Sequence, residues 1–126
     1  MKIDRQHILN VAETIRQQLV GLTPMNVLMS WGTSSLAATL MANMPALKFK
    51  VNGRLHKGEV IVALNEGVDY YEIYLQDSKE TRRIAEDVDF TQLGDIIDTA
   101  IESGTDPKEY EKFCEENLIK VLSRNC

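Results

Sequence analysis

The chain has 126 residues, of which 44% are hydrophobic and 26% charged, as in one soluble globular domain with its own core. No apolar run approaches the roughly 18 residues of a membrane-spanning helix, and the start, MKIDRQHILNVAE, has no apolar stretch of the signal-peptide kind, so we expect a cytoplasmic protein. The formal net charge of −5 argues mildly against a dedicated nucleic-acid-binding protein, whose affinity depends on neutralising phosphates.

The charge is divided unevenly along the chain. Residues 1–66 carry seven lysines and arginines against four aspartates and glutamates, whereas residues 67–126 carry seven against fifteen. A mildly basic half and a strongly acidic half can attract each other within one fold.

The first predicted element is a helix from about Asp4 to Val20. Asp4 is a residue type that caps helix N-termini, Gly21 is typical of a helix end, and Pro24 forbids continuation. One arc of the helical wheel collects the apolar side chains of Ile8, Val11, Ala12, Ile15, Leu19 and Leu22. We therefore expect that arc to face the core.

Two short apolar segments follow. MNVLMSW, residues 25–31, lies between a proline and a glycine and predicts a strand. GTSSLAATLMANMP, residues 32–45, leaves two alternatives: a short helix capped by a hydroxyl residue and ended by Pro45, or a flexible apolar arm. In either form it is the best candidate for a surface that meets a protein partner. Four apolar residues carry that prediction: Leu36, Leu40, Met41 and Met44.

Four strands are predicted where the apolar period becomes two. In residues 47–51 apolar side chains alternate with lysines, so one face should be buried. EVIVALN, residues 59–65, is apolar on both faces, as in a central strand, and residues 70–76 and 82–88 complete the set. The turn-rich links NGRLHKG, NEG and DSKET are short, which predicts an antiparallel meander.

Two helices are expected after the strands. DFTQ, residues 89–92, has the form of a capping box, and an apolar stripe follows it until Gly104. A second helix should begin at Asp106-Pro107, where a capping residue precedes a proline at the first helical position. The predicted fold is one α+β domain over residues 1–126, with an N-terminal helix, an antiparallel meander of four to five strands and two C-terminal helices.

The residues show no catalytic or metal-binding constellation. GTSSL at residues 32–36 lacks the second glycine of a nucleophile elbow, and no phosphate-binding glycine motif is present. His7 and His56 have no neighbouring ligand at helical or strand spacing. Cys114 and Cys126 are too few for a disulfide framework and are not spaced as a metal pair. We therefore expect no enzyme, no metal and no cofactor.

The predicted sheet offers one alternative function. Cations crowd the first hairpin and tyrosines lie on the polar side of a later strand, so a shared face could bind single-stranded nucleic acid by stacking and charge. The residues are Lys48, Lys50, Arg54, Lys57, Tyr70 and Tyr74. Lysines also protect sheet edges from pairing, and Glu72 among the tyrosines would repel phosphate.

The order of these features resembles a group of small, uncharacterised bacterial proteins associated with prophages and mobile elements. The resemblance rests on VLMSWGT, LKFK, VIVALNEGVDYYEIYL and EDVDFTQLGDII, and it covers residues 8–102. Residues 36–46 and the segment after Gly104 depart from the pattern. The resemblance implies an α+β shape and a mobile-element setting, and it implies no site residues.

The leading prediction is a small, non-enzymatic interaction module whose partner is a protein, either a second copy or another chain. Nucleic-acid binding through the sheet is the alternative, an enzyme of unknown class is the second alternative, and no membrane partner is expected.

Overall fold

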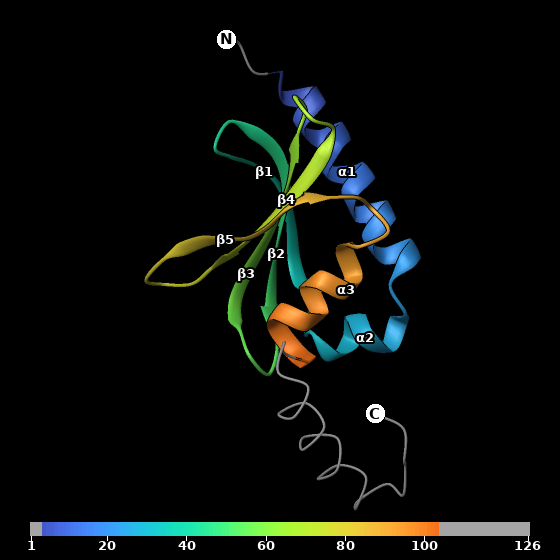
Figure 1. Cartoon of the computed structure of the whole chain (residues 1–126), viewed down its shortest axis with the longest axis vertical. Helices are drawn as coiled ribbons and strands as arrows, with labels where there is room; N and C mark the ends of the chain where they lie inside the picture. Colours follow the sequence, from blue (N-terminus) through green and yellow to red (C-terminus); the bar gives the residue numbers. More distant parts are fainter. Residues whose placement is uncertain (1–3, 104–126) are drawn as a thin grey trace, which may run out of the picture.

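The structure is a computed structural model that describes residues 4–103. Two helices open the chain, and five strands and a short helical segment follow them (Figure 1). The elements are α1 (Arg5–Leu22), α2 (Met25–Ser30), β1 (Ser34–Met41), β2 (Met44–Asn52), β3 (Lys57–Asn65), β4 (Tyr70–Gln76), β5 (Thr81–Val88), α3 (Leu93–Asp98) and η1 (Thr99–Ser103). The predicted α+β class is confirmed.

The five strands form one antiparallel sheet in the order β1-β2-β3-β4-β5, so each strand pairs with its neighbours in the sequence. This arrangement is the predicted meander, with five strands. The prediction that residues 59–65 form a central strand is also confirmed, because β3 lies third in the order. A central strand is buried on both faces, which explains its near-continuous apolar run.

Helix α1 begins as its sequence indicates. The Asp4 side chain accepts a hydrogen bond from the backbone N–H of Gln6 at 2.9 Å, which satisfies one of the free donors of the first turn. The helix continues through Gly21 to Leu22 and is capped at Thr23, two residues beyond the predicted end. Its buried face consists of Val11, Ala12, Ile15 and Leu19.

The strand predicted for residues 25–31 is wrong. Met25–Ser30 form the short helix α2, which follows Pro24, and Trp31 caps its C-terminus. A proline with a φ of −56° is suited to the start of a helix, and one and a half turns are too short for a helical period to be visible in the sequence. Trp31 is completely buried, so its side chain anchors the C-terminal end of α2 in the core.

Both alternatives for residues 32–45 are also wrong, because Ser34–Met41 form the edge strand β1. Ala42 and Asn43 have φ values of 49° and 65° and make a two-residue hairpin that returns the chain into β2. Alanine, leucine and methionine favour helices, but pairing with β2 outweighs that local preference. Pro45 ends no helix; it lies in β2 opposite Leu40.

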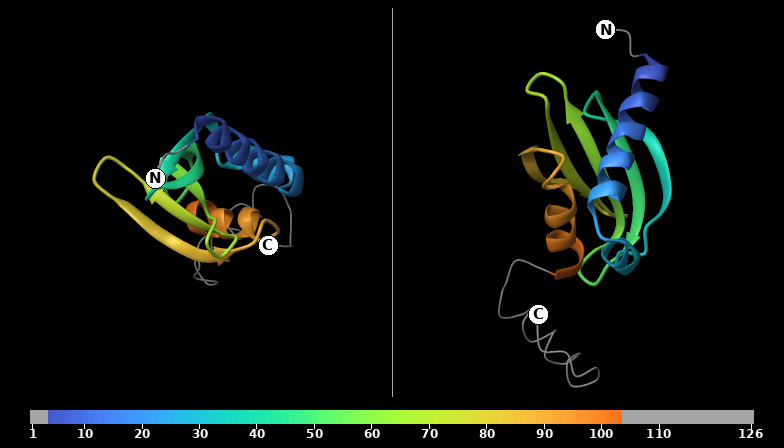
Figure 2. Two further views of the ribbon diagram at one scale, coloured as in Figure 1. Left: turned by 90° about the horizontal axis from the view of Figure 1, so that it is seen from above. Right: turned by 90° about the vertical axis from the view of Figure 1, so that its right-hand side faces the viewer.

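The helices α1 and α3 both cover the same face of the curved sheet, which we call the inner face (Figure 2). One core lies between these helices and the sheet. It includes Ile15, Leu19, Trp31, Phe49, Val60, Val62, Ile73, Leu75, Leu93, Ile97 and Ile101. The opposite, outer face has no helix from residues 4–103 over it (Figure 2).

The bonds of a capping box form at residues 89–92 only in part and in a turn before the helix, because α3 begins at Leu93 and its N-cap Gln92 makes no side-chain cap hydrogen bond. The N–H of Thr91 donates to Asp89 Oδ1 at 2.8 Å, and the N–H of Asp89 donates to Gln92 Oε1 at 3.1 Å. The expected apolar stripe places Leu93, Ile97 and Ile101 in the core. The helix predicted after Gly104 lies outside the described residues. None of the helices within residues 4–103 is long and apolar enough to cross a membrane.

Candidate functional site: the free edge of the sheet at β1

Strand β1 is one end of the sheet. Within residues 4–103 only β2 pairs with it, so its other side is a free edge. Its eight residues, SSLAATLM, include no charged residue and no proline. Leu36 and Leu40 are 41% and 39% exposed. Natural sheets usually protect such edges with charges or prolines, because an open strand is a template for pairing with another chain.

The hairpin that closes β1 shows which backbone groups face the free side. In a two-residue hairpin the closing pair, here Met41 and Met44, exchanges hydrogen bonds, and bonded pairs then alternate along the ladder. Leu40 and Ala38 therefore direct their N–H and C=O groups away from β2. Leu36 continues the alternation, because the bulge residue with positive φ is Ser35 (φ 56°).

The other edge, β5, has the opposite character. Its sequence TRRIAEDV carries four exposed charged residues: Arg82, Arg83, Glu86 and Asp87. Its register with β4 shifts at two places, and Asp87 has a φ of 54°. Charges and bulges are devices that prevent edge pairing. The two edges of the sheet therefore differ, and β1 lacks the charges that β5 carries.

The four predicted partner residues are divided between the two faces of the sheet. Leu36 and Leu40 lie on the inner face beside the free edge, as does Ala38, which pairs with the inward-facing Leu47. Met41 and Met44 lie on the outer face, where they pack on a small apolar cluster of Ala46, Ile61 and Ala63. Leu36 and Leu40, at the free edge, are therefore more accessible to a partner than Met41 and Met44.

A polar network surrounds Glu72 on the outer face. Its carboxylate accepts hydrogen bonds from Tyr74 Oη at 2.7 Å and Asn65 Nδ2 at 3.0 Å, and Arg83 Nη1 lies 3.6 Å away. Two hydrogen bonds lower the pKa of the Glu72 carboxyl: the bond from Tyr74 has the largest effect, and the bond from Asn65 has the next largest. They outweigh burial, which raises the pKa. Burial and the bond to Glu72 raise the pKa of Tyr74.

The predicted nucleic-acid residues share a face only in part. A register row across all five strands joins Ala37, Lys48, Ile61, Tyr74 and Arg83, so Lys48 and Tyr74 lie on the same outer face. By the alternation of side chains Lys50 and Lys57 also lie there, and the exposed Tyr70 lies at its end, opposite Asn65.

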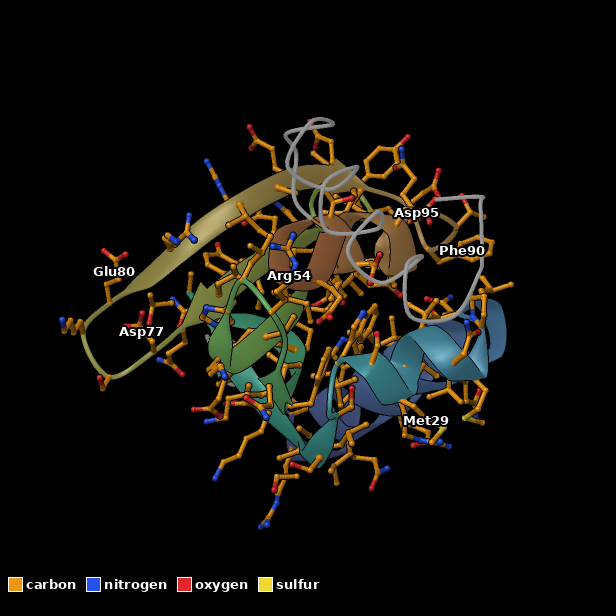
Figure 3. All side chains as sticks on the ribbon, turned by 90° about the horizontal axis from the view of Figure 1, so that it is seen from below. Met29, Arg54, Asp77, Glu80, Phe90 and Asp95 are labelled. Carbon is orange, nitrogen blue, oxygen red and sulfur yellow. The ribbon has the colours of Figure 1, made fainter. Side chains whose placement is uncertain are left out.

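Carboxylates lie among those cations. Lys48 Nζ is 3.5 Å from Glu59 Oε2, and Lys50 is the register partner of Glu59. Arg54 is not on this face: its N–H and Nε donate to Glu102 Oε2 and to the Glu102 carbonyl at 2.9 and 2.8 Å, which holds it against η1 (Figure 3). The outer face is therefore a mixed-charge surface rather than a cationic one.

Two features were not found from the sequence. Met29 is 74% exposed on α2 and points into solvent (Figure 3), which was missed because α2 was predicted as a strand. A groove of about 430 Å³ separates β5 from α3 and is lined mainly by apolar residues, with Arg82 and Asp95 among them. Its lining comes from segments that are separate in the sequence, from Leu55 to Ala100, and that meet only in the folded chain.

Within residues 4–103 no group of three or more His, Cys, Asp or Glu side chains is arranged to hold a metal ion. Ser34 and Ser35, the two serines of the GTSSL segment, lie at the exposed start of β1. Comparison of the chain with models of protein families, with curated proteins and with solved structures gave no match.

Proposed function

We propose that the chain is a small, non-enzymatic protein-interaction module that binds an extended protein segment as an added strand beside β1. The observation that carries the proposal is the contrast between the edges: β1 has no charged residue and two exposed leucines, whereas β5 has four exposed charged residues and two register shifts where β1 has one. Strand addition supplies main-chain hydrogen bonds for affinity and alternate side-chain contacts for specificity.

The alternative, binding of single-stranded nucleic acid on the outer face, has weaker support. Lys48, Lys50, Lys57 and Tyr74 share that face, but Glu59 and the buried Glu72 lie between them. Each carboxylate opposes the phosphate neutralisation on which such binding depends.

We further propose that the chain is a cytoplasmic protein encoded by a mobile genetic element. The proposal rests on the sequence alone, which resembles proteins of that kind.

Site-specific photo-crosslinking tests the proposed edge. A benzoylphenylalanine replaces Ala37 on β1 or, as a matched control, Thr81 on β5; both are exposed, outer-face residues of edge strands. The variants are irradiated in the cells that make the protein, and the linked peptides are identified by mass spectrometry. We expect protein adducts from position 37 and few from position 81.

A second substitution tests whether those adducts need the open edge. Leu40→Lys places a charge beside the free side of β1, whereas Met29→Lys adds the same charge on α2, where Met29 is more exposed still. Adducts from position 37 should disappear with Leu40→Lys and persist with Met29→Lys. No adducts at either position, or adducts that Leu40→Lys leaves unchanged, would rule out binding at β1.

A further inference from the structure

We propose that the strand added beside β1 is β1 of a second copy of this chain, antiparallel to the first and centred on Ala38. The inference rests on the proposed function and identifies its partner. It follows from three properties of β1: the order of its side chains, the direction of its backbone groups and the distribution of charge around it.

The side chains of β1 are nearly palindromic. Residues 36–40 read Leu-Ala-Ala-Thr-Leu, with Ala38 in the middle. When two copies pair antiparallel about Ala38, each Leu36 lies opposite Leu40 of the other copy, and each Ala37 lies opposite Thr39. Both leucines are exposed in one chain, and such cross-strand apolar pairs stabilise a sheet.

The backbone groups agree with this register. Leu36, Ala38 and Leu40 are the residues whose N–H and C=O groups face the free side, as derived from the hairpin of Ala42 and Asn43. In the proposed register these same residues oppose one another, Ala38 with Ala38 and Leu36 with Leu40. Each opposed pair can exchange both bonds, so the interface gains about six main-chain hydrogen bonds. A shift by one residue would oppose bonding groups to residues whose groups face β2.

Charge favours this edge for self-association. The chain as a whole is acidic, and residues 67–103, which include β4 and β5 at the far side of the sheet from β1, carry ten aspartates and glutamates against three lysines and arginines. Strand β1 has no charge of its own, and the half that contains it carries a small positive excess. Two copies joined at β1 therefore keep the acidic strands β4 and β5 of one copy apart from those of the other, whereas two copies joined at β5 would bring them together.

The mass of the protein in solution tests for the pair. Sedimentation velocity of the full chain over a range of concentrations should show a reversible shift from one chain mass to two. Leu40→Lys should raise the dimer dissociation constant about tenfold or more, since both leucine pairs are lost. Met29→Lys should leave the constant unchanged. Trp31 fluorescence during urea unfolding checks that each dilute variant is folded, because Trp31 is the only tryptophan and is buried.

Disulfide trapping tests the register. In a chain with Cys114→Ser and Cys126→Ser, Ala38→Cys places two thiols opposite each other, at about 5.5 Å between Cα atoms, within the range of a disulfide. Ala37→Cys is the matched control, because position 37 opposes Thr39 rather than itself. Mild oxidation should give a covalent dimer with Ala38→Cys and little with Ala37→Cys.

The outcomes separate this inference from the function on which it rests. A monomer at every concentration, or equal trapping of the two cysteine variants, overturns the pairing of two β1 strands. If photo-crosslinks from position 37 then reach another protein and depend on Leu40, the edge still binds a partner. If those crosslinks are also absent, both proposals fail.

Discussion

The indole Nε1 of Trp31 donates a hydrogen bond to Asp98 Oδ1 at 2.9 Å, across 67 residues of sequence. Trp31 ends α2 and Asp98 ends α3, so the bond joins two helical segments beside the core. Trp31 is fully buried, and a buried N–H without an acceptor is costly.

Asp98→Ala should therefore destabilise the fold by about 1–3 kcal/mol, the typical cost of a buried polar group that loses its partner. Asp98→Asn retains an acceptor oxygen and should cost less. Urea unfolding followed by Trp31 fluorescence measures both. Equal stability of the alanine variant and the natural chain would show that the bond contributes nothing.

Gly53 is required by a close approach of the loop between β2 and β3 to η1. A Cβ at position 53 would collide with the carbonyl oxygen of Ile101, the same oxygen that accepts from the N–H of Leu55 at 2.7 Å. Gly53→Ala should cost about 1–3 kcal/mol, as overpacking does. Gly21→Ala is the control: nothing lies within 4 Å of its Cβ, and alanine inside α1 should stabilise by about 0.5–1 kcal/mol. A Gly53→Ala variant as stable as the natural chain would contradict this contact.

The Glu72 network predicts a dependence of stability on acid. Because the folded state lowers the pKa of Glu72 below its ordinary value of 4.5, its contribution is present above that pH and is lost as the pH falls through the folded pKa. The unfolding free energy of Glu72→Gln should therefore fall less below about pH 4.5 than that of the natural chain. Tyr74→Phe removes the hydrogen bond that lowers the pKa of Glu72 most. The pH dependence of its unfolding free energy should lie between those of the natural chain and Glu72→Gln. Parallel pH profiles for the natural chain and Glu72→Gln would contradict this role.

The hairpin between β1 and β2 can be strengthened. Ala42 has a φ of 49°, a region in which residues with a side chain are strained and glycine is not. Ala42→Gly should stabilise the fold by about 0.5–1 kcal/mol, measured by urea unfolding. Asn43→Ala should destabilise it, because asparagine tolerates its φ of 65° better than alanine. The reverse order would argue against the strand β1 itself.

The mixed charge of the outer face predicts weak nucleic-acid binding. In an amide NMR titration with a mixed single-stranded oligonucleotide, we expect no salt-sensitive shifts near Lys48, Lys50, Tyr70 and Tyr74. Shifts that disappear at moderate salt, and that Lys48→Glu with Lys50→Glu abolishes in a folded chain, would instead favour the nucleic-acid alternative.

The sequence determined those elements that local interactions or a clear hydrophobic period specify. The cap at Asp4, the hydrogen-bonded turn between Asp89 and Gln92, and the period of two from Leu47 onward each specify local structure. Short turn-rich links then leave an antiparallel meander as the simplest arrangement.

Only the tertiary structure decided α2 and β1. The apolar residues 25–31 are too few to distinguish a helix from a strand by period, and the burial of Trp31 against Asp98 comes from a segment far along the chain. Residues 34–41 favour a helix locally and become a strand because β2 offers them a ladder of hydrogen bonds. The candidate site depends on that outcome: an edge exists only where a sheet ends, and the end of a sheet is a property of the whole fold.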